Sequence, residues 1–312
     1  MTHQPENPPA ASLESGSPEM SPVLEERPHD FKYEVVEGFF IQNGDMPKRL
    51  PYEELLKKNF GLKDESPERW HNLKAAIKKL QDEAPKGVYY KVLFLGRHGE
   101  GYHNFAKAKY GGKAWGKHWA SLYGDGELTW GPDPELTPLG ISQAQSVYRC
   151  WLQEAKFGAP IKKGEMKWYV SPMARAGHTL QVSWGELLAG VPEICEDWRE
   201  HYGVNTCDER VTKTEIQKRF PDFIFEEGFA ENDELWKPDD RETEEHMQMR
   251  AQRAMDKLFG PSGAKETYIS ITGHHGIFRN LLAVLHHRKY SLDTGEMLPV
   301  VVKATRIGGK EL

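Results

Sequence analysis

The chain contains little cysteine: three residues in 312, widely spaced, with no Cys-x-x-Cys pair. Such a set is poor material for a disulfide framework and suits a reducing compartment. Cys195 and Cys207 flank His201, but this spacing matches no common zinc pattern. We therefore expect neither a disulfide-stapled domain nor a metal site at these residues.

The chain also lacks an apolar run that approaches the length of a membrane span, and its polar, proline-rich start does not resemble a secretory signal. Its formal net charge is −6, whereas nucleic acid and acidic membranes reward clustered positive charge. We therefore expect no nucleic-acid or membrane partner and a cytoplasmic location, with entry to the nucleus left open. These features leave the oligomeric state undetermined.

Three parts of the chain differ in composition. Residues 1–30 are rich in Pro, Ser, Glu and Asn with few large apolar side chains, which predicts a flexible tail. Residues 31–84 combine an aromatic segment with helical spacing that is interrupted near 61–67, and we expect them to form an extension packed on the core. Residues 85–312 then form the predicted main domain.

Within the main domain, apolar runs of strand length alternate with helical patterns. The patterns predict strands at 88–95, 167–170 and 268–272 and helices from about 137, 174, 242 and 276. Thr137 can cap its helix, and Pro138 suits the first helical position. Repeated strand–helix units predict an α/β protein, a three-layer α/β/α sandwich with a mostly parallel central sheet. Residues 98–134 contain several glycines and little periodicity, so we expect a long functional loop over the site, with simple packing of its aromatic residues as the alternative.

The first of these strands ends on a chemically distinctive tripeptide, Arg97-His98-Gly99. Arginine keeps its proton, and imidazole titrates near neutrality. The pair suits phosphate chemistry, because arginine holds the anion and a neutral imidazole nitrogen can attack phosphorus. A surface Arg-His after a strand explains the tripeptide alone equally well, so the rest of the chain must decide.

Four segments, in chain order, resemble the motifs of one family. They are Leu-Gly-Arg-His-Gly-Glu-Gly-Tyr-His-Asn (95–104), Glu-Leu-Thr-Pro-Leu-Gly-Ile-Ser-Gln-Ala (135–144), Ser-Pro-Met-Ala-Arg-Ala-Gly-His-Thr (171–179) and Thr-Gly-His-His-Gly-Ile-Phe-Arg-Asn-Leu-Leu (272–282). Together they resemble branch 1 of the histidine phosphatase, or phosphoglycerate mutase-like, superfamily. Residues 39–42, 101–104 and 204–210 are most similar to a fungal and plant branch of small phosphatases. The resemblance implies a phosphoglycerate mutase-like sandwich and makes 85–312 the catalytic domain.

The resemblance also assigns roles. It implies that His98 is the nucleophile and forms a phosphohistidine, and that phosphate is bound by Arg97, Asn104, Arg175 and His274. Most of these residues follow predicted strands, whose carboxyl ends meet at one edge of the sheet. The arginines offer forked donors, and His274 can donate to the phosphoryl group as charge develops. These groups can supply the positive field that a metal supplies elsewhere, so we expect no metal and no cofactor.

The departing alkoxide also needs a proton. Glu200, in Trp-Arg-Glu-His-Tyr-Gly (198–203), resembles the acid segment of the family. Glu100 and Asp208 are alternatives, and an ion pair with Arg199 or Arg210 would make Glu200 structural instead.

Four residues are candidates for the substrate pocket: Glu100, His103, His178 and His275. His275 stands where glycine is usual, and the register Gly-His-x-Gly assigns the catalytic place to His274. His103 and His178 lie close in sequence to predicted phosphate ligands, so either can shape the choice of substrate.

The leading hypothesis is a metal-independent phosphatase, a phosphoric monoester hydrolase that acts on a small phosphorylated metabolite. One alternative is phosphoglycerate mutase-type transfer, in which the phosphoryl group returns to the substrate. A second is a catalytically silent binding or regulatory protein on the same fold, although such a protein has no chemical need for both His98 and His274. The sequence does not name the natural substrate.

Overall fold

The computed structural model describes residues 29–45, 48–263 and 265–308. A seven-stranded sheet with the order β1-β7-β2-β6-β3-β4-β5 forms its centre. The strands are β1 Phe31–Val35, β2 Val88–Arg97, β3 Met166–Val170, β4 Glu193–Ile194, β5 Ile224–Phe225, β6 Tyr268–Gly273 and β7 Met297–Arg306. β7 is antiparallel to β1 and β2, and the other neighbouring pairs are parallel. The mostly parallel sheet confirms the predicted fold class.

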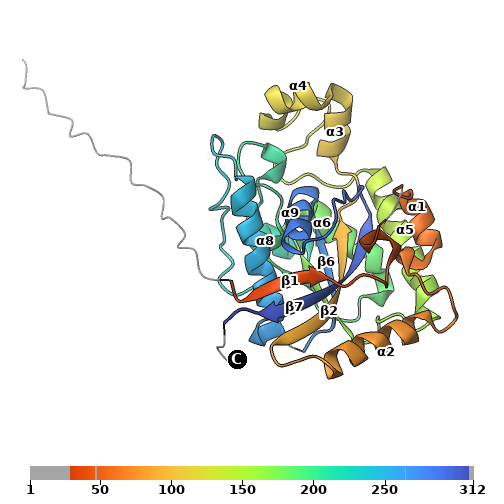
Figure 1. Ribbon diagram of the computed structural model, residues 1–312. Helices are drawn as coiled ribbons and strands as arrows, with labels where there is room; N and C mark the ends of the chain where they lie inside the picture. The colour runs from red at the N-terminus through yellow and green to blue at the C-terminus, as the bar shows by residue number, and fades with distance from the viewer. Residues whose placement is uncertain (1–28, 46–47, 264, 309–312) are drawn as a thin grey trace, which may run out of the picture.

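Helices cover both faces of the sheet (Figure 1). Successive side chains of a strand point to opposite faces, and β2 follows this rule: Phe94 joins one core and Leu95 the other. The Phe94 face is covered by α1 Tyr52–Lys57, α2 Arg69–Asp82, α5 Pro138–Ala155 and α6 Ala174–Trp184. The Leu95 face is covered by α8 Glu244–Phe259 and α9 His275–Val284. These layers make the predicted α/β/α sandwich.

The helix predicted from Thr137 begins there. Thr137 accepts a hydrogen bond from the backbone N–H of Gly140 at 3.1 Å, and Pro138 occupies the first helical position. The break predicted near 61–67 separates α1 from α2. Helix α7 Lys213–Arg219 was not predicted, although Thr212 and Glu215 form a capping box at its start. A local capping signal thus located the start of α5, whereas the one at α7 was overlooked.

The prediction of a long loop over 98–134 was wrong. This segment contains α3 Tyr102–Tyr110, α4 Gly112–Lys117 and a 3₁₀ turn at Trp119–Ser121. They enclose a small apolar cluster with buried Trp115 and Trp130. Figure 1 shows α3 and α4 standing apart from the sandwich, at the top of the view. The tryptophans of this segment thus serve packing, which its low apolar periodicity concealed.

Residues 31–84 contribute directly to the sandwich, because β1 pairs with β7 and α2 packs against β2. The domain boundary at 84/85 stays a prediction, and residues 1–28 of the predicted tail lie outside the described residues. Within the described part of the chain, no helix combines the length and apolar character needed to cross a membrane.

Candidate active site

Strand pairing brings the two motif histidines together. Arg97, the last residue of β2, is opposite Gly273 of β6, and the N–H of His98 donates to the carbonyl of Gly273 at 3.0 Å. His98 and His274 therefore leave adjacent parallel strands at the same edge of the sheet. Their ring centroids are 5.0 Å apart, and they are 2% and 0% exposed. The structure thus places side by side the two histidines that the sequence analysis assigned to one edge of the sheet.

Two glycines allow the segment after His98 to pack tightly. A Cβ on Gly99 would lie 2.3 Å from the carbonyl oxygen of Gly140, and one on Gly140 would lie 2.1 Å from that of Glu100. Contacts this short exclude any side chain. The N–H of Gly99 also donates to Oγ1 of Thr179 at 2.9 Å. The first turns of α5 and the body of α6 thus hold the backbone that carries His98.

The backbone also fixes the tautomer of His98. Its Nδ1 lies 2.6 Å from the carbonyl oxygen of Gly99, which can only accept, so Nδ1 carries the proton and Nε2 keeps its lone pair. Burial, together with the charges of Arg175 and Arg97, holds the pKa of His98 well below 6.5. The ring is therefore neutral at pH 7, with a nucleophilic nitrogen available.

His274 is held by a serine from the neighbouring strand end. Its Nε2 lies 2.7 Å from Oγ of Ser171, and its buried Nδ1 has no hydrogen-bond partner among the described residues. Ser171 Oγ already accepts from the N–H of Met173, so its hydroxyl can donate to Nε2 and leave Nδ1–H as a donor. Burial and the nearby charge of Arg175 keep the pKa of His274 well below 6.5.

The two arginines are anchored but not saturated. Arg175 is fully buried, and it donates to the carbonyl of Cys207 at 2.7 Å and to Asp208 Oδ1 at 3.0 Å. Arg97 donates to the carbonyl of Leu292 at 2.7 Å. The Nε of each is buried without a partner in the described part of the chain. Each guanidinium therefore has donor capacity left for an anion.

Asn104 and Glu100 make local contacts beside this pocket. Asn104 Oδ1 accepts from the N–H of Gly101 at 3.0 Å, which leaves the amide group as a possible donor. Glu100 Oε1 accepts from the hydroxyl of Thr137 at 2.7 Å. Asp208, the other alternative acid, bonds Arg175 and also Arg241 at 2.9 Å. Asp208 is thus engaged in positioning an arginine.

The carboxylate of Glu200 lies at the N-terminus of α9. Its Oε2 accepts from the N–H of Gly276 at 2.9 Å, and its Oε1 from the N–H of His201 at 3.0 Å. Burial acts to raise the pKa of Glu200, but the hydrogen bond and charge of the His201 ring, whose Nδ1 lies 3.3 Å from Oε1, and the hydrogen bond from the N–H of Gly276 hold it well below 4.5. Arg199 pairs with Glu196 and Asp233, and Arg210 pairs with Glu196, whereas the ion-pair partner of Glu200 is His201.

Three candidates for the substrate pocket remain: His103, His275 and His178. The His103 ring centroid is 5.4 Å from that of His98. His275 is half-buried, and burial and Arg97 lower its pKa. His178 instead points to Glu135, with Nδ1 2.5 Å from Oε2, and packs against Phe220. No recorded contact joins His178 to the imidazole pair within the described residues.

The sequence analysis missed the residues that support the site. His201 bridges Glu200 and Glu244, with its Nε2 3.0 Å from Oε1 of Glu244. Ser171 orients His274, and Asp208 orients Arg175. The position of Ser171 directly after a predicted strand was a usable signal. Asp208 acts through Arg175, and His201 links Glu200 to Glu244; these partners are 33 and 43 residues away, and no local pattern points to these roles.

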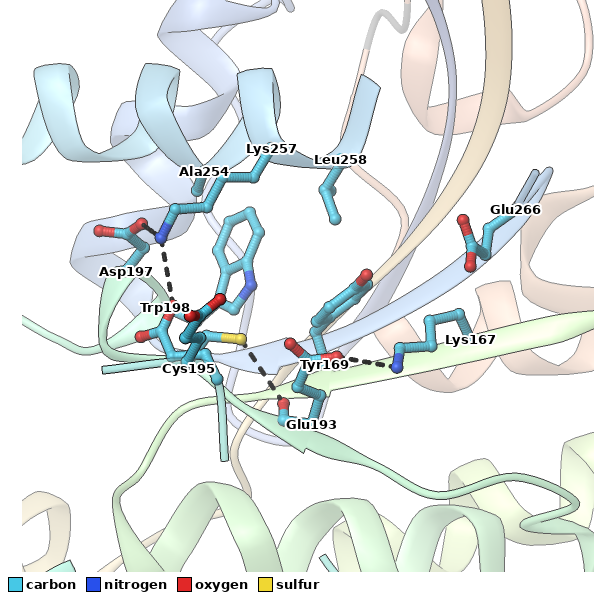
Figure 2. Close-up of a pocket in the computed structure, with 12 residues that line it drawn as sticks. Lys167, Tyr169, Glu193, Cys195, Asp197, Trp198, Ala254, Lys257, Leu258 and Glu266 are labelled. Carbon is cyan, nitrogen blue, oxygen red and sulfur yellow. Dashed lines mark hydrogen bonds and ion pairs between the residues drawn. The ribbon is translucent and has the colours of Figure 1, made fainter. Parts of the chain in front are cut away.

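A cavity of about 480 Å³ lies elsewhere, beneath the end of α8 and beside β3 and β4 (Figure 2). Its charged lining is largely self-paired: Lys167 contacts Glu193 at 2.8 Å, and Lys257 contacts Asp197 at 2.8 Å. None of the predicted site residues lines it. No group of three or more His, Cys, Asp or Glu that could hold a metal occurs in the described ranges.

Comparisons with known proteins agree with the motifs. The model of the histidine phosphatase superfamily (branch 1) matches residues 117–301, a range that begins after His98 and contains Arg175, Glu200 and His274. A probable phosphoglycerate mutase of Arthroderma benhamiae is 36% identical over 290 residues, 87% of this chain and 84% of that protein.

Two further relatives show the breadth of the group. A probable phosphoglycerate mutase of Saccharomyces cerevisiae is 36% identical over 240 residues, 70% of this chain and 80% of that protein. Phosphoglycerate mutase-like protein 1 of Arabidopsis thaliana is 29% identical over 219 residues, 63% of this chain and 72% of that protein. With its family match and its fungal and plant relatives, the chain belongs to branch 1 of the histidine phosphatase superfamily.

Proposed function

We propose that the chain is a metal-independent phosphatase that hydrolyses a small phosphorylated metabolite through a phosphohistidine on His98. One observation carries the proposal: a buried, neutral imidazole pair, 5.0 Å between centroids, lies beside two arginines with unused donors. A neutral nucleophile in a cationic pocket suits attack on an anionic phosphoryl group. The arrangement supplies positive charge from the protein's own side chains.

The chemistry runs in two steps. Nε2 of His98 attacks phosphorus, and the bond between phosphorus and the ester oxygen breaks. Arg97, Arg175 and the Nδ1–H of His274 stabilise the charge on the phosphoryl oxygens, and Asn104 adds a neutral donor. Water then attacks phosphorus, the P–N bond breaks, and inorganic phosphate leaves with His98 restored.

Glu200 is the proposed proton donor to the departing alkoxide. It is ionised in the free protein, because the His201 ring and the N–H of Gly276 depress its pKa. Entry of a phosphate dianion raises the proton affinity of a neighbouring carboxylate, so Glu200 can take up a proton as substrate binds. The same carboxylate can accept the proton of the attacking water in the second step.

A second candidate is phosphoglycerate mutase-type transfer, because two relatives are named probable phosphoglycerate mutases. The two reactions share the first step and differ in the acceptor. Incubating the full chain with 3-phosphoglycerate and following both free phosphate and 2-phosphoglycerate separates them. Phosphate release without isomerisation supports the phosphatase, and isomerisation that exceeds release supports the mutase.

The proposed function is tested by hydrolysis of p-nitrophenyl phosphate by the full chain, with and without a strong chelator. Activity should survive the chelator and be lost in His98→Ala. His178→Ala is the matched control, because that ring bonds Glu135 outside the imidazole pair. Absence of turnover in the wild-type protein favours the silent binding protein. Loss on chelation, restored by one metal, would contradict the metal-independent mechanism.

A further inference from the structure

A third imidazole lies beside the catalytic pair. His103 is in the first turn of α3, and its ring centroid is 5.4 Å from that of His98. Helical side chains lean toward the helix N-terminus, and this ring folds back over Gly101, where an added Cβ would lie 2.8 Å from Nδ1. His103 is partly exposed, whereas His98 and His274 are buried. Among the three rings, His103 is therefore the one nearer to solvent.

The surroundings of His103 suit an anion. Its Nδ1 is buried and has no hydrogen-bond partner within the described residues. The titratable groups that face it are Arg97 and His98 at the end of β2, Arg175 on α6 and His274 after β6. All four are basic. An unpartnered ring nitrogen among basic groups is satisfied best by a negatively charged acceptor.

We propose that His103 is a third imidazole ligand of the phosphoryl group, which it contacts from the solvent side while His98 and His274 contact it from the buried side. This proposal rests on the proposed function and adds a residue that determines how the phosphoryl group is recognised. The ring closes the pocket over a bound phosphoryl group. His103 thus favours phosphate esters whose phosphoryl group is fully ionised.

The contact couples anion binding to a proton. In the free protein, burial and the charges of Arg175 and the other basic groups keep the pKa of His103 well below 6.5, so the ring is neutral at pH 7. A bound dianion offsets those charges and raises that pKa. Binding therefore takes up a proton between the two pKa values, and anion affinity falls as pH rises through that window.

Sulfate is the probe, because it remains a dianion at all pH values around neutrality and any bound proton must enter the protein. Calorimetry of sulfate binding to the full chain, in buffers of different ionisation enthalpy, measures both affinity and proton uptake without turnover. The variants are His103→Asn, which removes the ring, and His103→Phe, which keeps an aromatic ring without nitrogen. His178→Asn is the control. Circular dichroism and thermal melting establish that each variant is folded.

Wild-type protein and His178→Asn should bind sulfate alike. Both His103 variants should bind it about tenfold to a hundredfold more weakly, the scale of one hydrogen bond to a charged group, and should take up fewer protons. Equal affinity and equal proton uptake in folded variants would overturn the role of His103 and leave the proposed function intact. Failure of the wild-type protein to bind sulfate and to hydrolyse a phosphate ester would overturn both.

Discussion

Replacing Glu200 by glutamine isolates the proton that the leaving group needs. The substitution keeps the size of the side chain and an oxygen that can accept from the N–H of Gly276, now 2.9 Å from Oε2. It removes the ability to deliver a proton. Any loss of rate that depends on the leaving group then reports on proton transfer rather than on the shape of the pocket.

The expected magnitude follows from the role. General acid catalysis contributes about 10²–10⁴-fold, which corresponds to about 3–5 kcal/mol of transition-state stabilisation. An alkyl phosphate, whose alkoxide is a poor leaving group, should lose this whole factor in Glu200→Gln. A nitrophenyl phosphate needs little help from an acid and should lose less than about tenfold.

The assay compares kcat for one alkyl and one nitrophenyl phosphate, in both proteins, across pH. Because the protonated carboxyl is the working form, wild-type kcat for the alkyl ester should fall as pH rises through the pKa of Glu200 in the complex. That alkaline fall should be absent in Glu200→Gln. If both substrates slow equally, the reasoning is refuted, and Glu200 serves binding or structure.

Gly276 offers a second perturbation of the same carboxylate. A Cβ there would lie 2.0 Å from Oε1 of Glu200 and 2.6 Å from Nδ1 of His201, so the carboxylate must move in Gly276→Ala. A displacement of about 1 Å costs on the order of 10²-fold in rate. Gly116→Ala is the matched control, because no atom beyond its chain neighbours and the backbone of its own helix lies within 4 Å of that position.

Two further predictions concern stability. Glu154 is fully buried and accepts hydrogen bonds from Arg69 Nε and Trp70 Nε1, both at 2.7 Å. Glu154→Ala leaves the buried guanidinium of Arg69 without its partner, so the free energy of unfolding in urea should fall by about 3–5 kcal/mol. A loss below about 1 kcal/mol would contradict this. His98 and His274 have pKa values held well below 6.5, so below pH 6.5 the unfolded chain binds protons that the folded chain does not. The free energy of unfolding should then fall with decreasing pH by up to about 1.4 kcal/mol per pH unit per histidine, and a pH-independent value from pH 6.5 to 5 would contradict the neutral pair.

The sequence predicted the parts of the fold that depend on local signals. Apolar runs of strand length placed β2, β3 and β6, and the Thr137-Pro138 cap placed the start of α5. β1 and β7 were missed because they pair segments from opposite ends of the chain. Pro299 has no backbone N–H to donate, which also argues against a central strand. Since β1 pairs with β7 only at residues 302–306, no ladder hydrogen bond to β1 is lost at Pro299.

The candidate site also contains residues that local signals predict and residues whose placement depends on distant contacts. Arg97, His98 and His274 were predictable, because parallel strands bring their carboxyl ends to one edge. The placement of Glu200 was not, since it depends on an irregular segment held by Arg250, which donates to the carbonyl of Arg199 at 2.7 Å. His178 shows that proximity in sequence does not fix the direction of a side chain: it shares α6 with Arg175, but its ring bonds Glu135.

The central claim is the covalent bond between phosphorus and Nε2 of His98. Rapid quenching of the wild-type protein with a ³²P-labelled substrate, followed by peptide mapping, tests it directly. We predict label that is lost in acid and stable in base, located on His98, formed and discharged at rates compatible with turnover, and absent from His98→Ala but present in His178→Ala. Turnover without any such label, or label on another residue, would contradict the account.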